Sequence, residues 1–180
     1  GQSTGGDGEL NFSVFAADLL ALMDHLQIAK AHLLGFSDGG NLALTFALAH
    51  PERVQSLILN GANLEPGGVK LSTQLPIVLG YGCCRLLSPF SHKARQNGAV
   101  LGLMVNHPHI LPQALAALTM PALVIVGERD MIRDRHSQLI ARSLPNAQFV
   151  RIPGGDHFCA AKCPEVFNHA VLSFLQNLPA

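Results

Sequence analysis

Three polar residues of this sequence, Ser37, Asp130 and His157, have the types and positions that nucleophilic catalysis requires. A serine hydroxyl is a weak nucleophile until an imidazole accepts its proton. The imidazole in turn needs a carboxylate that fixes its tautomer and stabilises the imidazolium. Ser37 is the centre of a Gly-x-Ser-x-Gly motif, and the other two residues each end a short glycine-containing loop. Such a set is suited to acyl transfer through a serine ester.

The motif around Ser37 lies between a predicted strand and a predicted helix. Residues 31–34 form a short apolar run, and residues 41–50 form an apolar helical pattern that Pro51 ends. Strand, sharp turn and helix are the setting of a nucleophile elbow, in which the serine has a strained backbone. The backbone N–H of Asp38 is therefore expected to point at the developing oxyanion, whereas its carboxylate need not take part.

Alternating strand and helix patterns predict a parallel sheet with helices on both faces. The expected elements, after a loop over 1–11, are a helix at 13–27, strands near 31–36, 54–60, 122–126 and 148–152, and helices near 41–50, 133–144 and 164–177. Loops that leave the carboxyl ends of neighbouring parallel strands meet at one edge of the sheet. Ser37 follows the first strand, Asp130 the third and His157 the fourth, so the three side chains are expected to converge.

Residues 64–118 interrupt this regular alternation, because proline and glycine residues separate short helical runs. We predict that they form an inserted helical cap and that residues 1–63 and 119–180 form the core domain. The cap holds four Lys or Arg residues against one Glu, a net charge of +3. These cations either favour an anionic ester or solvate the outer face of the cap.

Other residues compete for the three roles. Asp134 is the rival carboxylate, but it is also placed to cap the next helix, whereas Asp130 directly follows a strand. Asp156 is adjacent to His157 and is expected to hydrogen-bond within its own loop. The remaining histidines are interpreted as packed or solvated, and Cys159 as a packed thiol. His107 and His109 lack a third ligand at a useful spacing, so neither a metal nor a cofactor is predicted.

Composition limits the class of protein. With 180 residues, of which 48% are apolar, the chain can bury one core. Twelve basic and twelve acidic residues balance, and without a basic cluster neither nucleic acid nor an anionic membrane is an expected partner. No apolar run approaches the roughly 20 residues of a spanning helix. The four cysteines form no Cys-x-x-Cys pair, so free thiols and a cytoplasmic location are expected.

Several segments together resemble the α/β-hydrolase superfamily, and most closely its small cap-bearing, esterase-like members. They are Gly35–Gly40, His50–Val54, Leu57–Asn63, Pro121–Asp130 and Pro153–Phe158. The resemblance implies the chain order Ser, Asp, His of that fold. A serine in place of a carboxylate nucleophile implies hydrolysis of a small-molecule ester or amide, with His157 as general base and acid and Asp130 orienting it. The alternative within the fold is perhydrolase or carbon–carbon bond hydrolase chemistry.

The resemblance also implies a difference at the amino terminus. Gly1-Gln2-Ser3-Thr4 resembles the end of a stretch that relatives place after their first strands, so the fold is expected to lack those strands. In the family the missing part supplies the second oxyanion donor. The strand at 31–36 would then expose an apolar edge and favour self-association. A further alternative is therefore an inactive or incomplete hydrolase that needs the missing strands or a partner chain.

Overall fold

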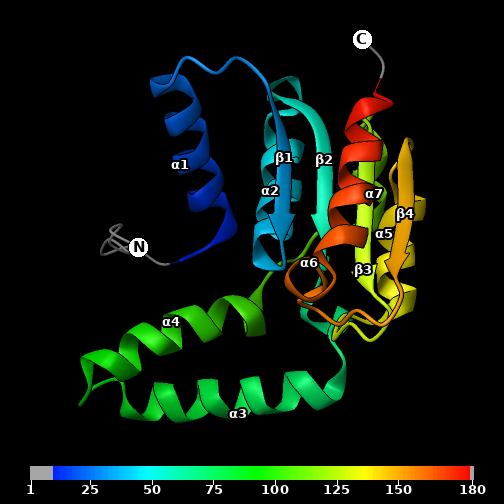
Figure 1. The fold of residues 1–180 in the computed structure, drawn as a ribbon. Helices are drawn as coiled ribbons and strands as arrows, with labels where there is room; N and C mark the ends of the chain where they lie inside the picture. The colour runs from blue at the N-terminus through cyan, green and yellow to red at the C-terminus, as the bar shows by residue number, and fades with distance from the viewer. Residues whose placement is uncertain (1–9, 179–180) are drawn as a thin grey trace.

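A four-stranded parallel sheet of order β1-β2-β3-β4 lies at the centre of the computed structural model, which describes residues 10–178 (Figure 1). Its strands are β1 (Ala31–Phe36), β2 (Val54–Asn60), β3 (Ala122–Gly127) and β4 (Ala147–Ile152). All three neighbouring pairs are parallel. The predicted α/β class is confirmed. All four predicted strands are present, and their ends differ from the predicted ends by at most one residue.

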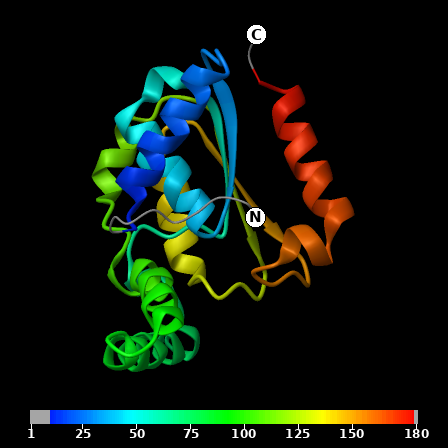
Figure 2. The same cartoon turned by 90° about the vertical axis from the view of Figure 1, so that its left-hand side faces the viewer.

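Helices cover both faces of the sheet, as the alternating pattern predicts (Figure 2). One face carries α1 (Phe12–His25), α2 (Asp38–Ala49) and α5 (Asp134–Ser143), and the other carries α6 (Cys159–Lys162) and α7 (Pro164–Gln176). Successive strand residues point to opposite faces. Leu57 and Leu59 accordingly pack with α1, α2 and α5, whereas Ile58 packs with α6 and α7. The sheet thus separates two apolar cores.

Residues 64–118 contain a helical hairpin of α3 (Leu71–Leu87) and α4 (His92–Asn106), which lies beyond the carboxyl ends of the strands (Figure 1). Short 3₁₀ helices at Pro66–Gly68 and Pro112–Ala117 flank it, and a third follows α2 at Pro51–Arg53. The prediction of short helical runs broken by glycine is wrong here. A Cβ at Gly98 would lie 3.4 Å from Cβ of Cys84, and one at Gly102 3.3 Å from the ring of Tyr81. The glycines thus lie inside two continuous helices, and at Gly102 the absence of a side chain lets α4 pack closely against Tyr81 of α3, so packing overrides local propensity.

The outer edge of β1 has no paired strand among residues 10–178. Leu34 and Phe36 on this strand are 52% and 39% exposed. Self-association through this edge and the division into core and cap stay predictions. The loop expected over residues 1–11 falls mainly on residues 1–9, which lie outside the described residues. None of the described helices has the length and apolar character that crossing a bilayer requires.

Candidate active site

Ser37 occupies a strained turn between β1 and α2. Its φ of 54° and ψ of −120° lie in a region that non-glycine residues rarely adopt. Its N–H donates to the carbonyl of Asn60 on β2, with 2.8 Å between N and O. A Cβ at Gly35 would lie 2.2 Å from the carbonyl oxygen of Gly39, whereas a Cβ at Gly39 would meet nothing within 4 Å. Only the first glycine of the motif is therefore required for the close approach of strand and helix.

His157 connects the hydroxyl of Ser37 to the carboxylate of Asp130. Its Nε2 lies 3.0 Å from Ser37 Oγ, and its Nδ1 lies 2.8 Å from Asp130 Oδ1. A carboxylate can only accept, so Nδ1 carries the proton and Nε2 is left to accept from the serine hydroxyl. His157 is 5% exposed and Asp130 3% exposed. The structure thus brings together all three side chains that the sequence selects.

Asp130 is held by its own turn. Its Oδ1 also accepts from the N–H of Ile132 at 2.9 Å, and its Oδ2 from that of Gly127 at 3.4 Å. The ammonium of Lys70, just before α3, donates to the backbone carbonyl of Asp130. These bonds orient the carboxylate toward Nδ1 of His157, and one of the four Lys or Arg residues within 64–118 thereby has a structural role.

The two rival carboxylates have other partners. Asp134 forms an ion pair with Arg151 beside the first turn of α5. Asp156 forms an ion pair with Lys162, and the hydrogen bond from that ammonium holds the pKa of the Asp156 carboxyl below its usual range. Within residues 10–178 neither carboxylate is hydrogen-bonded to His157. Of the three candidate carboxylates, Asp130 is thus the one that is hydrogen-bonded to the imidazole of His157.

Asp38 begins α2, and its N–H is one of the helix's free amino-terminal donors. No acceptor for this N–H occurs among the described residues. The Asp38 carboxylate lies 3.3 Å from Nδ2 of Asn41. Burial raises the pKa of this carboxyl, although the Asn41 hydrogen bond and the positive charge that His157 can carry act in the opposite direction. An anionic group at the start of α2 is thus only partly solvated.

A buried pair of asparagines was not predicted from the sequence. Asn41 Nδ2 donates to Asn63 Oδ1 at 3.0 Å, and the N–H of Asn63 donates to Asn41 Oδ1 at 2.9 Å. The pair ties α2 to the loop that follows β2. The signal that could have revealed it is a lone asparagine in the apolar run 41–50, because a buried amide needs a partner.

His136 supports the same loop from α5. Its Nε2 accepts from the N–H of Leu64 at 2.9 Å, and burial lowers the pKa of the imidazole. A neutral ring is needed to accept this bond. The residue therefore has the packed role that the sequence suggests for most of the histidines.

Cys159 lies two residues after His157 and is fully buried. Its Sγ donates to Oδ1 of Asn60 at 3.4 Å. Burial and the nearby charge of Asp130 raise the pKa of this thiol to about 11. The side chain is thus a thiol at neutral pH, which agrees with a packing role.

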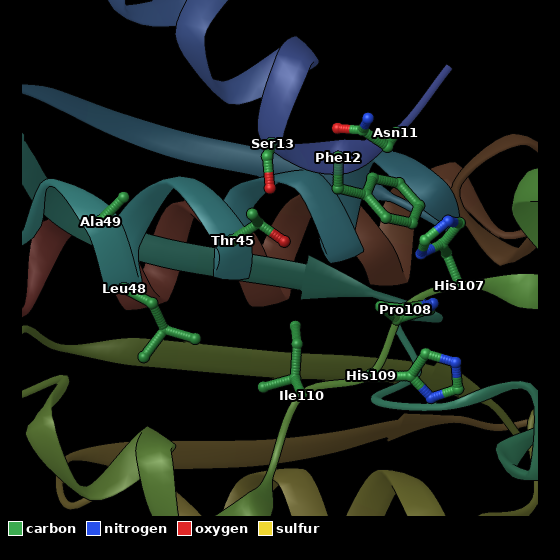
Figure 3. Close-up of a pocket in the computed structure, with 10 residues that line it drawn as sticks. All are labelled: Asn11, Phe12, Ser13, Thr45, Leu48, Ala49, His107, Pro108, His109 and Ile110. Atoms are coloured by element: carbon green, nitrogen blue, oxygen red, sulfur yellow. The ribbon is translucent and has the colours of Figure 1, made fainter. Parts of the chain in front are cut away.

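His107 and His109 line a pocket of about 740 Å³ that is separate from Ser37 (Figure 3). The start of α1, the second half of α2 and the segment 107–110 surround this pocket, and Thr45 and Leu48 lie on its α2 side (Figure 3). Within the described residues no group of three or more His, Cys, Asp or Glu side chains could hold a metal ion. The two histidines therefore form part of the wall of this pocket. Among the described residues no third side chain joins them to complete a metal site.

Comparison with known proteins places these features in a wider group. A family model described as the alpha/beta hydrolase fold matches residues 1–82. The 2-hydroxy-6-oxononadienedioate/2-hydroxy-6-oxononatrienedioate hydrolase of Cupriavidus pinatubonensis is 30% identical over 97% of this chain and 71% of its own length. RutD of Caulobacter sp. (strain K31), whose name is that of a carbamate hydrolase, is 29% identical over 89% of this chain and 70% of its own. A thermophilic esterase from Thermogutta terrifontis superposes with a TM-score of 0.78 at 25% identity, over 98% of this chain and 76% of that one.

Proposed function

This chain belongs to the α/β-hydrolase superfamily, and from that premise we propose that it is a serine hydrolase of small-molecule esters or amides. Ser37 is the nucleophile, His157 the general base and acid, and Asp130 the group that orients the imidazole. The backbone N–H of Asp38 is one oxyanion donor.

The proposed reaction has two half-reactions that use the same groups. In the first, Ser37 Oγ attacks the substrate carbonyl carbon while its proton passes to Nε2 of His157, and the Asp38 N–H stabilises the oxyanion. His157 then protonates the leaving group, and an acyl ester on Ser37 remains. In the second, a water gives a proton to His157 and attacks this ester, and His157 then passes that proton to the departing Ser37 Oγ, so that a carboxylic acid, the free Ser37 hydroxyl and the neutral imidazole result.

One observation carries the proposal: Ser37 Oγ, the two ring nitrogens of His157 and Asp130 Oδ1 form a continuous hydrogen-bonded series with separations of 3.0 Å and 2.8 Å. These distances fall within the reach that a nucleophile and its base require before reaction. The strained φ of Ser37 supports the same role, because backbone strain persists at sites where the surrounding structure enforces it.

A second candidate is hydrolysis of a carbon–carbon bond next to a ketone. The name of the Cupriavidus relative supports it, because a hydroxy-oxo-dienedioate holds a ketone and two carboxylates but no ester. Water can therefore cleave such a compound only at a carbon–carbon bond. The same serine and histidine can serve both reactions, so the difference lies in the substrate that the pocket accepts.

Covalent labelling with a fluorophosphonate tests the nucleophile directly. We expect a single adduct by intact mass, mapped to Ser37 by peptide analysis and absent in Ser37→Ala and His157→Ala. His169→Ala is the matched control, because His169 is exposed on α7. A folded wild-type protein that gains no adduct, or an adduct that persists in Ser37→Ala, would overturn the proposal.

Substrate turnover then separates the two candidates. p-Nitrophenyl acetate and a small panel of alkyl esters report acyl transfer, whereas a 2-hydroxy-6-oxo dienoate reports carbon–carbon cleavage through the loss of its conjugated absorbance. Turnover of the esters alone supports the first candidate. Faster turnover of the dienoate by several orders of magnitude supports the second.

A further inference from the structure

Gly61, the first residue after β2, lies directly against the imidazole of His157. Its φ is +65°, and an added Cβ would lie 2.8 Å from Cε1 and 2.9 Å from Nδ1 of His157. The same Cβ would lie 3.5 Å from Oδ2 of Asp130. The first two separations are shorter than a carbon can normally approach these atoms. The imidazole therefore occupies space that is open only because residue 61 has no side chain.

The obstruction at Gly61 differs from that at Gly35 and Gly127. A Cβ at Gly35 would lie 2.2 Å from the carbonyl oxygen of Gly39, and one at Gly127 2.2 Å from that of Asp156. Those substitutions would force backbone segments apart. At Gly61 the obstructing atoms belong to the ends of side chains, which can rotate. A methyl group there would displace the imidazole and leave the fold in place.

Gly61 is itself fixed relative to the nucleophile. Its N–H donates to the carbonyl of Ile125 on β3 at 3.0 Å. Two residues later, the reciprocal bonds between Asn63 and Asn41 tie the same loop to the first turns of α2, which begins next to Ser37. Asn41 is fully buried, so water does not compete for these bonds. The surface on which the imidazole rests and the serine that it must reach are thus parts of one hydrogen-bonded unit.

We propose that Gly61 is a positioning residue for the His157 imidazole, and that the Asn41–Asn63 pair fixes the position of Gly61 relative to α2. The inference rests on the proposed role of His157 as the base. Gly61 leaves open the space in which the imidazole lies, but it carries no group that reacts. Its effect is to keep Nε2 directed at Ser37 Oγ while Nδ1 stays on Asp130.

The test compares Gly61→Ala with Gly154→Ala. Gly154 has almost the same left-handed backbone, with φ of +67°, but a Cβ there would meet nothing within 4 Å. Both variants carry the strain of alanine at positive φ, so the urea midpoint should fall in both. Only Gly61→Ala should lose activity, by about 100-fold in kcat for p-nitrophenyl acetate with little change in KM. Gly154→Ala should stay within about threefold of wild type.

The rate of fluorophosphonate labelling distinguishes positioning from loss of stability. In Gly61→Ala the displaced imidazole no longer accepts the proton of Ser37 Oγ, so the labelling rate constant of the folded protein should fall together with kcat. In Gly154→Ala this rate constant should stay close to that of the wild type. A change in stability alone would lower the fraction of folded protein without changing the rate constant of the folded molecules.

Each outcome bears on the proposal. Equal fluorophosphonate labelling rates in the two alanine variants, or a wild-type kcat in Gly61→Ala, would overturn it while leaving the serine hydrolase assignment intact. No labelling of the wild type would overturn that assignment and this inference with it. If Gly61→Ala does not fold, Asn63→Ala takes its place, because it removes the bond from Asn41 Nδ2 and keeps the backbone bond to Asn41 Oδ1. We expect about a tenfold fall in kcat for that variant, and wild-type kcat would overturn the inference.

Discussion

His157 Nε2 lies 3.0 Å from Ser37 Oγ, although 120 residues separate the two in the chain. Ser37 follows β1 at one edge of the sheet, and His157 follows β4 at the other. The loop that carries the histidine must therefore cross the carboxyl ends of β3 and β2 to reach the serine. Parallel strands make this possible, because their loops all leave at the same edge.

The end of β3 is shaped for this crossing. A Cβ at Gly127 would lie 2.2 Å from the carbonyl oxygen of Asp156, and the N–H of Arg129 donates to the carbonyl of Gly155 at 2.8 Å. The histidine loop thus rests on the acid loop. Asp130 and His157 are held together by backbone contacts as well as by their own hydrogen bond.

Asparagine at position 130 is predicted to remove most of the activity. An amide can present its NH₂ group to Nδ1 of His157, which favours the tautomer that cannot accept the serine proton. We expect kcat to fall by about 10⁴-fold in Asp130→Asn. The matched variant is Asp134→Asn, which loses only a partly exposed ion pair with Arg151 and should retain kcat within about twofold. Ester turnover in both proteins checks this, and a larger loss in Asp134→Asn than in Asp130→Asn would contradict the assignment.

The three convergent side chains and the sheet could be predicted because they depend on local patterns. Apolar runs of strand length, a helix that Pro51 ends and loops that end in Asp130 and His157 fix the order of the elements. A parallel sheet then requires the loops to meet at one edge. The contact between Ser37 and His157, although 120 residues apart, could therefore be inferred from the order of the elements alone.

The supporting contacts could not be predicted because they depend on packing between distant segments. Asn41 and Asn63 are 22 residues apart, and neither stands in a motif. By local propensity, Gly98 and Gly102 are expected to break a helix. The local pattern does not show that α3 packs against them. Gly61 likewise follows a strand as many turn glycines do, and only the position of His157 gives it a specific role.

Asp38 is predicted to destabilise the fold when it is ionised. Burial raises the pKa of its carboxyl above the ordinary value of 3.8. The unfolded chain therefore releases this proton at a lower pH than the folded chain, so stability falls as the pH rises from about 3.8 through the folded-state value. Asp38→Asn should raise the free energy of unfolding at pH 7 and give a smaller gain at pH 3, as measured by urea denaturation. Asp18→Asn, at an exposed position of α1, is the control, and an equal gain for Asp38→Asn at both pH values would contradict the argument.

The cysteines are predicted to differ in their rates of alkylation. Cys83 is exposed on α3, whereas Cys159 is buried and its raised pKa of about 11 keeps it protonated. At pH 8, iodoacetamide should modify Cys83 first and Cys159 only when the protein unfolds. Peptide mass mapping with and without urea measures this order. Ester turnover should persist after Cys83 is modified, and early modification of Cys159 in the folded protein would show that its packing role is wrong.

Alanine substitutions in the hairpin of α3 and α4 are predicted to separate helix propensity from helix packing. A Cβ at Gly82 in α3 would meet nothing within 4 Å, so Gly82→Ala should raise the free energy of unfolding by about 0.4–1 kcal/mol. A Cβ at Gly102 in α4 would lie 3.3 Å from the Tyr81 ring, a separation tighter than most carbon contacts. Gly102→Ala should therefore gain less or lose stability, because the Tyr81 ring must shift to admit the methyl group. Urea denaturation of both variants measures the difference, and an equal gain in both would mean that Gly102 is not needed for the close packing of α3 and α4.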